Sequence, residues 1–168
     1  MQEVELRKLF DEYYLPVMRY LSHLTGEVTA AQDLSQEVFL KLYYQGLAEP
    51  GSPRAWLFRV ASNLGYNYLR QQDRVQRETA VYQTNQGSPG LEELLVRGEE
   101  RVTVRRVLQS LSERDRTCLI MRFSGFSYQE IAEVIGAKKS SVGTILLRAM
   151  QRFRREYEDK GERSDELL

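Results

Sequence analysis

Apolar residues recur at helical spacing along most of the chain, and the first two such patterns lie in its N-terminal part. The first covers residues 3–24 and contains Pro16, so we expect a kinked helix or two consecutive helices there. The second starts at a capping-box pair, Thr29 with Gln32, and ends at Gly46. Its apolar residues share one face, and the other face carries Asp33, Gln36, Glu37 and Lys41.

A third helix is predicted from Ser52 and Pro53, a cap followed by a first-turn proline, to Arg70 or slightly beyond. Trp56 belongs to its apolar stripe, which favours core packing over stacking on a ligand. Spacings of four, four and three place on one face Arg59, Asn63, Asn67 and Arg70. Such side chains can bind bases and phosphates, and the alternative is a solvated face.

The clearest motif is a helix-turn-helix between Ser127 and Arg148. Ser127 with Glu130 forms a capping box, Ala132 leaves room for a crossing helix, and Gly136 can end the first helix in a left-handed conformation. The second helix presents a small polar face with cations that fits a DNA major groove. Its members are Lys138, Lys139, Ser140, Ser141, Thr144 and Arg148. A surface helical hairpin with ordinary lysines is the alternative.

The apolar pattern is lost over residues 73–90, where Gln, Asn, Gly, Ser and Pro accumulate, and we interpret this stretch as a flexible linker. The apolar pattern resumes near Leu91. A further helix is expected to start at Ser112 with Asp115 and to run through about Phe123, which would face the helix-turn-helix.

The sequence thus predicts an all-α fold of two small helical domains joined by a flexible linker. The domains are residues 1–72 and residues 91–156, the second containing the helix-turn-helix. Residues 157–168 form an acidic tail without a core pattern, which we expect to be frayed or disordered.

Charge separates the two domains although the net charge of the 168 residues is zero. Residues 1–72 carry 7 basic and 8 acidic side chains, whereas residues 103–155 carry 11 basic and 4 acidic ones. The basic surplus therefore lies on the segment with the helix-turn-helix, as expected of a module that binds phosphates.

Other classes of function find little support. Cys118 is the single cysteine and lies among apolar residues, which indicates a buried thiol, and His23 is the single histidine. The pair Asp33 and Glu37 is the one candidate for metal or acid–base chemistry, and it lacks partners in the sequence. No phosphate-cradling loop, signal peptide or apolar run near 18 residues occurs. We expect a cytoplasmic protein without enzymatic activity, cofactor, metal or membrane insertion.

The chain resembles bacterial RNA polymerase sigma factors of the sigma-70 family, most closely those of the extracytoplasmic-function type (group 4). The resemblance rests on DLSQEVFLKLY and SPRAWLFRVASNLGYNYLR, which are similar to sigma region 2. It rests equally on LSERDRTCLIMRFSGFSYQEIAEVIGAKKSSVGTILLRAMQRFRR, which is similar to the promoter-binding region 4. It covers nearly the whole chain apart from the linker and the tail.

This resemblance implies a division of roles. In the first domain it assigns binding of the clamp helices of core RNA polymerase to Asp33, Gln36 and Glu37. It assigns capture of the melted downstream (−10) promoter strand to a face comprising Arg59, Asn63, Asn67 and Arg70, with the loop from Leu47 to Ser52 as the base-capture region. Capturing unstacked bases costs a few kcal/mol per base.

In the second domain the resemblance implies duplex binding at the upstream (−35) element. The residues matched are Lys138, Lys139, Ser140, Ser141, Thr144 and Arg148. Gly143 and Ile145 stand where relatives often carry arginines, so no reader role is carried over to them. The resemblance also implies contact with the polymerase flap, a linker that passes near the polymerase active centre, and an anti-sigma factor as a further partner.

Two rival functions make different predictions. A helix-turn-helix repressor or activator would form dimers on palindromic sites, whereas a sigma factor acts as a monomer with polymerase. A helical adaptor for proteins would show no salt-dependent binding to DNA. The region 2 motifs favour the sigma factor, because neither rival needs them.

Overall fold

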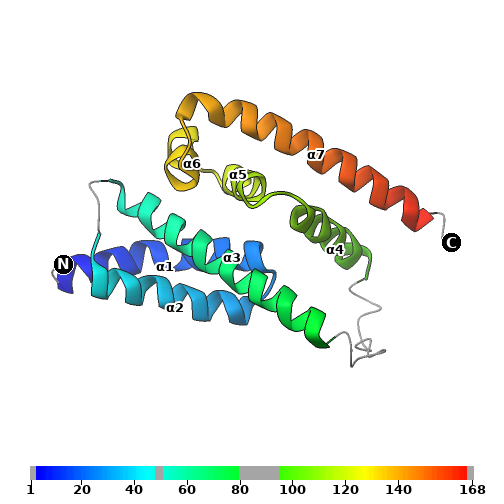
Figure 1. Cartoon of the computed structure of the whole chain (residues 1–168). Coiled ribbons are helices and arrows are strands. Elements are labelled where there is room, and N and C mark those ends of the chain that lie inside the picture. The colour runs from blue at the N-terminus through cyan, green and yellow to red at the C-terminus, as the bar shows by residue number, and fades with distance from the viewer. Residues whose placement is uncertain (1–2, 48–50, 80–94, 166–168) are drawn as a thin grey trace.

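The computed structural model describes residues 3–47, 51–79 and 95–165. These residues form seven helices and, within those ranges, no strand. The predicted all-α fold is therefore confirmed. Figure 1 shows the helices in two groups, α1 to α3 and α4 to α7, which lie against each other.

The first group consists of α1 (Glu3–Thr25), α2 (Val28–Gln45) and α3 (Pro53–Thr79). Their apolar faces meet in a core that includes Leu21, Val38 and Leu57, which are fully buried. Gly65 allows α3 to approach α1 closely, because a Cβ atom there would lie 2.6 Å from Leu24 Cδ2. The first three predicted helices are thus all present.

Residues 3–25 form one helix with the exposed Pro16 inside it, so of the two alternatives, a kinked helix or two consecutive helices, the second is excluded. The boundaries of α2 and α3 differ from the expected ones. The α2 helix begins after Glu27, so Thr29 is not its cap; the hydroxyl of Thr25 instead accepts from the Glu27 amide at 3.2 Å. The α3 helix continues to Thr79, so the first seven residues of the expected linker are helical. Its remainder, residues 80–90, lies outside the described residues.

The second group consists of α4 (Leu95–Ser110), α5 (Glu113–Phe123), α6 (Tyr128–Ile135) and α7 (Lys139–Asp165). The predicted start near Leu91 lies outside the described residues. The Ser112 hydroxyl accepts from the Asp115 amide at the start of α5, as the sequence predicts. The Asp115 carboxylate is 1% exposed and pairs with Arg152, which ties α5 to α7.

The helix-turn-helix, formed by α6 and the first part of α7, has the expected geometry. The Ser127 hydroxyl accepts from the Glu130 amide at 3.2 Å, and the Glu130 carboxylate accepts from the Ser127 amide at 2.8 Å. Gly136 has φ +69° and ψ 34°, the left-handed conformation that glycine adopts at little cost. Ala132 is buried, and this allows α6 and α7 to cross closely.

Two expectations for the second group are wrong. Phe123 is 77% exposed and does not pack on the helix-turn-helix, because the buried face of α5 is formed by residues 115–121. The acidic tail continues α7 as a helix to Asp165, so the residues from 157 to that point are not frayed. Glu156, Glu158 and Asp159 are exposed, as expected of a solvated helix at this end.

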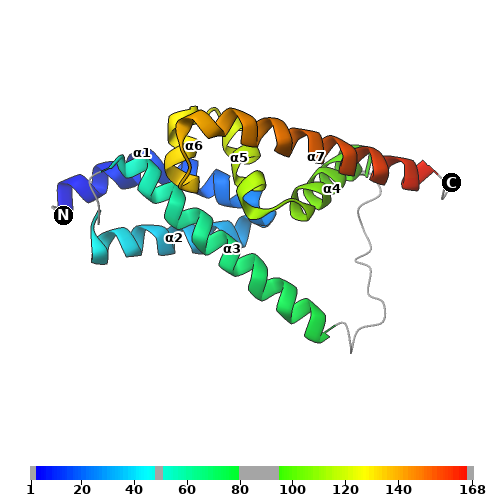
Figure 2. The same ribbon diagram turned by 45° about the horizontal axis from the view of Figure 1, so that its top comes forward.

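The two groups share one continuous apolar core. Phe58 of α3 and Phe126, in the turn before α6, pack edge to face with ring centroids 4.6 Å apart. The Tyr66 hydroxyl of α3 donates to the Glu113 carbonyl at 2.8 Å and lies 2.6 Å from the Thr117 hydroxyl. Figures 1 and 2 show α3 running beneath α5 and α6, with its C-terminal part extending beyond α2. This contact decides which predicted site residues are accessible.

Candidate nucleic-acid interface

The three predicted site residues of α2 share one exposed face. Asp33, Gln36 and Glu37 all project to solvent, while Leu34 and Phe39 between and beside them are buried. Spacings of three and four residues place the polar trio together on the helix. The trio therefore forms an acidic and amide-bearing surface that can pair with basic residues of another protein.

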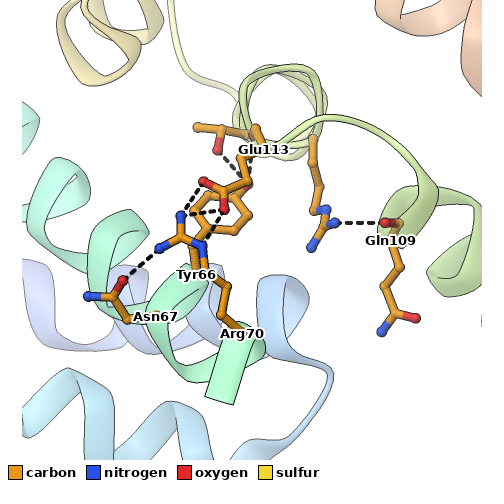
Figure 3. A network of polar contacts seen from close by, with 7 residues as sticks. Tyr66, Asn67, Arg70, Gln109 and Glu113 are labelled. Carbon is orange, nitrogen blue, oxygen red and sulfur yellow. Dashed lines mark hydrogen bonds and ion pairs between the residues drawn. The ribbon is translucent and has the colours of Figure 1, made fainter. Parts of the chain in front are cut away.

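The predicted site residues of α3 also lie on its exposed face, but three of the four contact other residues of this chain. Arg59 donates from Nη2 to the Glu133 carbonyl oxygen of α6 at 2.7 Å. Arg70 donates from Nε to Oε1 of Glu113 at 3.0 Å and from Nη2 to Oε2 at 2.7 Å. Its third nitrogen donates to the Asn67 side-chain oxygen at 2.8 Å. Figure 3 shows this network between α3 and the start of α5.

A hollow of about 270 Å³ lies at the N-terminal end of the same α3 face. Leu47, Trp56 and Arg59 line it from the first group of helices, and Glu133 closes it from α6. Trp56 is half-buried and packs against the core, as predicted, while its remaining surface faces this hollow. Of the expected base-capture loop, residues 48–50 lie outside the described residues. Asn63 is exposed but does not line the hollow.

The predicted duplex-binding residues gather at the start of α7. Lys138, Lys139, Ser140, Thr144 and Arg148 are exposed, and Ser141 is half-buried. The Ser141 amide bonds to the Lys138 carbonyl at 2.9 Å, so Lys138 caps the helix with its backbone. Val142 and Leu146 are buried on the opposite side and hold the helix on α6. The result is a cationic, hydroxyl-bearing ridge on a helix whose back is fixed.

The structure also shows two features beside these faces that the sequence did not predict. Arg54 pairs with Glu130 at 2.7 Å and stacks over Phe126, with its guanidinium carbon 4.2 Å from the ring centroid. Arg54 precedes the apolar stripe of α3, and no spacing rule links it to α6. Leu147 of α7 is 61% exposed. In the sequence, Leu147 falls outside the helical spacing of Val142 and Leu146, and this could have predicted that Leu147 is exposed.

A second feature that the sequence did not predict is an aromatic contact beside the start of α7. Tyr128, the first residue of α6, has its ring 3.6 Å from where a Cβ atom of Gly143 would lie. The Arg122 guanidinium carbon is 5.0 Å from the centre of the same ring. A cation and an aromatic ring therefore adjoin the position at which α7 lacks a side chain.

Neither metal chemistry nor membrane spanning is indicated by the described part of the chain. No group of three His, Cys, Asp or Glu side chains there is arranged to hold a metal ion. Among those residues no helix combines the length and the apolar character needed to cross a bilayer.

Two family models match the chain in the order of the two helix groups. Sigma-70 region 2 matches residues 9–75, and Sigma-70 region 4 matches residues 101–153. RNA polymerase sigma factor YlaC of Bacillus subtilis is 33% identical over 153 residues, which are 86% of this chain and 87% of that protein. ECF RNA polymerase sigma factor SigX of Bacillus subtilis is 24% identical over 167 residues, 93% of this chain and 85% of that protein.

Solved structures show the same fold. The sigma factor RpoE of Bartonella quintana, solved with the anti-sigma factor NepR, aligns with a TM-score of 0.63 at 19% identity, covering 92% of this chain and 97% of that one. CnrH, solved with the cytosolic domain of CnrY, aligns with a TM-score of 0.65 at 17% identity, covering 94% and 90%.

The chain belongs to the sigma-70 family of RNA polymerase sigma factors. Within that family its two-domain composition and relatives are those of the extracytoplasmic-function type, group 4. Its function is to direct core RNA polymerase to specific promoters and to initiate transcription there. Sigma factors are not enzymes in their own right.

Proposed function

We propose that three exposed helix faces divide the work of this sigma factor among polymerase binding, strand capture and duplex binding. The observation that carries the proposal is that the polar residues of α2, α3 and α7 lie on the solvent side of helices whose apolar sides are buried; on α3, Arg59 and Arg70 also bond to α6 and α5. Side chains held on rigid helices can meet a partner with little loss of conformational freedom.

The α2 face, with Asp33, Gln36 and Glu37, binds the clamp helices of the largest polymerase subunit. Two carboxylates and an amide on one helix face complement basic side chains on a partner helix. Contact with the polymerase flap belongs to the second domain, which sits on the upstream promoter element next to it.

The α3 face captures the non-template strand after melting. Asn63 can hydrogen-bond a base edge, whereas Arg59, Asn67 and Arg70 hold phosphates. The hollow beside Trp56 offers an apolar wall against which one unstacked base can rest. Melting costs a few kcal/mol per base, and these contacts offset that cost.

The start of α7 enters the major groove of the upstream element. Lys138 and Lys139 contact phosphates or base edges, Ser140, Ser141 and Thr144 lie nearest the groove floor, and Arg148 reaches the backbone. Gly143 brings no side chain, so the helix backbone can approach the bases closely.

An anti-sigma factor is the regulatory partner we propose, because the structurally similar sigma factor RpoE was solved in complex with the anti-sigma factor NepR. We place the chain's action in the cytoplasm, where polymerase and chromosome are. A dimeric repressor remains the rival function, but it does not account for the match to region 2.

The proposal is tested by transcription with purified core polymerase on a library of promoter fragments. We expect added initiation over core alone; its absence would contradict the proposal. Three variants then separate the faces. Reversing charge with Asp33→Lys and Glu37→Lys should abolish binding to core, while Asn63→Ala should leave core binding intact and reduce permanganate reactivity of melted thymines.

The third variant, Lys138→Ala with Lys139→Ala, should retain core binding and lose duplex affinity. Because each lost phosphate contact reduces the dependence of log K on log salt by about 0.9, the slope should fall by about 2. The matched control is Arg7→Ala with Lys8→Ala, which removes two exposed cations of α1 outside all three faces. An equal loss of duplex affinity in this control would show that the effect depends on net charge and not on Lys138 and Lys139.

A further inference from the structure

A groove of about 910 Å³ lies between the junction of α1 with α2 and three helices of the second group, α4, α5 and α7. Apolar side chains from all three of these helices line it: Val104 and Leu108 of α4, Leu119, Ile120 and Phe123 of α5, and Met150 of α7. The exposed ring of Phe123 thus forms part of the groove wall. A partly apolar cavity of a few hundred to about 1,000 Å³ is typical of sites for small organic molecules.

Arg116 of α5 brings a buried positive charge to this groove. The residue is 8% exposed and belongs to the groove lining. Its Nε donates to the Leu108 carbonyl oxygen at 2.8 Å, and its Nη2 donates to the Gln109 carbonyl oxygen at 2.9 Å. Figure 3 shows the second of these bonds. Among the described residues, the remaining nitrogen, Nη1, has no acceptor.

Arg116 also forms no ion pair with any residue that the structure describes, because the acidic residues next to it on α5 bind other cations. Glu113 pairs with Arg70. Asp115 pairs with Arg152. The two carbonyl groups at the end of α4 supply only the partial negative charge of a helix C-terminus, about half an elementary charge. A buried cation without a full counter-charge is costly, and an anion in the groove would remove that cost.

The other ionisable residues of the groove lining add to its positive charge. They are His23, Glu100, Arg101 and Arg105. Three arginines including Arg116 thus face one glutamate. Arg105 is exposed and reaches from α4 to the end of α1, since a Cβ atom at Gly26 would lie 2.7 Å from its Nε. The groove therefore combines an apolar wall with two arginines, one buried and one exposed, that can meet the same anion.

We propose that this groove binds an amphipathic anion with one carboxylate and a hydrocarbon chain, in the chemical class of the fatty acids. The carboxylate accepts from Nη1 of Arg116 and from Arg105, as arginine–carboxylate pairing favours. The chain lies on the wall that includes Phe123 and Met150. A protein partner commonly buries about 800 Å² of each surface, which is more than this groove offers. The proposal goes beyond the proposed function and does not depend on it.

The first test compares ligands by isothermal titration calorimetry of the full chain. Decanoate is the probe, and decanol, decyltrimethylammonium and acetate are the matched controls. We expect one decanoate per chain, bound at least about tenfold more tightly than decanol, because a hydrogen bond to a charged group contributes a factor of this order. Decyltrimethylammonium has the wrong charge and acetate lacks the chain, so both should bind more weakly than decanoate by at least the same factor.

The second test changes the arginines. Arg105→Met should weaken decanoate binding by about fivefold, the upper range for an exposed ion pair. Arg106→Met is the matched control, because Arg106 is the next exposed arginine of α4 and does not line the groove. It should change the affinity by less than about twofold. Arg116→Met should weaken binding by more than about tenfold. If this buried variant does not fold, the exposed Arg105 still carries the test.

The third test locates the bound molecule by NMR of the chain labelled with ¹³C at the methionine methyl groups. Met150 lines the groove, whereas Met18 of α1 is similarly half-buried and does not. We expect decanoate to shift the Met150 signal and to leave that of Met18 in place. Equal binding of decanoate and decanol, equal losses in Arg105→Met and Arg106→Met, or an unchanged Met150 signal would each overturn the proposal. Binding of an acidic amphipathic peptide without binding of decanoate would overturn it as well.

Discussion

Cys118 shows at the scale of one residue how burial affects an ionisable group. It is fully buried in α5, and burial, with a smaller effect of nearby Asp115, raises the pKa of its thiol from 9.0 to about 11. A thiol in these surroundings stays protonated and unreactive at neutral pH. The sequence predicted a buried thiol from its apolar neighbours, and the structure confirms it.

This pKa makes the free energy of unfolding depend on alkaline pH. The unfolded thiol releases its proton at a lower pH than the folded one, so the stabilising contribution is complete below about pH 9 and is lost as the pH rises toward about 11. We expect urea midpoints to fall over that window. In Cys118→Ala the urea midpoint should fall less over this pH range. Loss of the sulfur also shifts the midpoint, but by the same amount at every pH, so the difference between the two pH values is the quantity compared.

Wild type and variant are compared by urea unfolding at about pH 8 and about pH 10.5. A slope remains in the variant, because burial also raises the pKa of Tyr20 and of Tyr66 in the same direction. Parallel pH slopes for the two proteins would show that Cys118 does not contribute.

Among the elements, α7 contains a local weakness at Gly143, next to the residues that we propose bind duplex DNA. A glycine inside a helix costs about 1 kcal/mol relative to alanine. A Cβ atom there would make only ordinary contact with Tyr128, at 3.6 Å. We therefore expect Gly143→Ala to raise the free energy of unfolding by about 0.5–1 kcal/mol, measured as a higher urea midpoint with an unchanged m-value.

The matched comparison is Gly136→Ala in the turn of the same motif. Its φ of +69° disfavours any residue with a Cβ atom, so this change should lower stability although nothing occupies the space beside it. Opposite signs for the two substitutions are the expected result. The same sign for both would mean that conformation does not decide their effect.

Element starts were predictable where a side-chain cap defines them, as at Ser112 and Ser127. The start of α2 was mispredicted, because Glu27 precedes it without a side-chain cap and Thr29 merely imitates one. The ends of the helices were harder to predict from the sequence than their starts. Beyond Arg70 and beyond Arg155 the helices continue through residues with little apolar character, and backbone hydrogen bonding extends a helix without leaving a sequence pattern.

The molecule as a whole adds a property that no local pattern contains, namely the contact between its two domains. The sequence places Arg59, Asn67 and Arg70 on one helix face, but it does not say that Glu113 and Glu133 cover that face. Spacing rules relate residues a few positions apart, whereas these partners are separated by 43 and 74 positions. Family resemblance assigned the face to DNA, and the structure shows it occupied by the chain itself.

Phe126 is a buried residue at which this contact joins the two domains. It is 4% exposed, packs against Phe58 and lies beneath the Arg54 guanidinium. Because a shared core unfolds as one unit, the free wild-type chain should show coincident urea transitions by two probes. One probe is the fluorescence of Trp56, the sole tryptophan, which reports the first domain; the other is far-UV ellipticity, which reports all helices.

Phe126→Ala removes the shared ring and should cost about 3–5 kcal/mol of stability. Since that ring joins the domains, we expect the two probes to give separate midpoints in this variant. Tyr44→Ala, at a side chain 78% exposed on α2, should leave them coincident. Separate midpoints in the wild type would mean that the domains fold independently in the free chain.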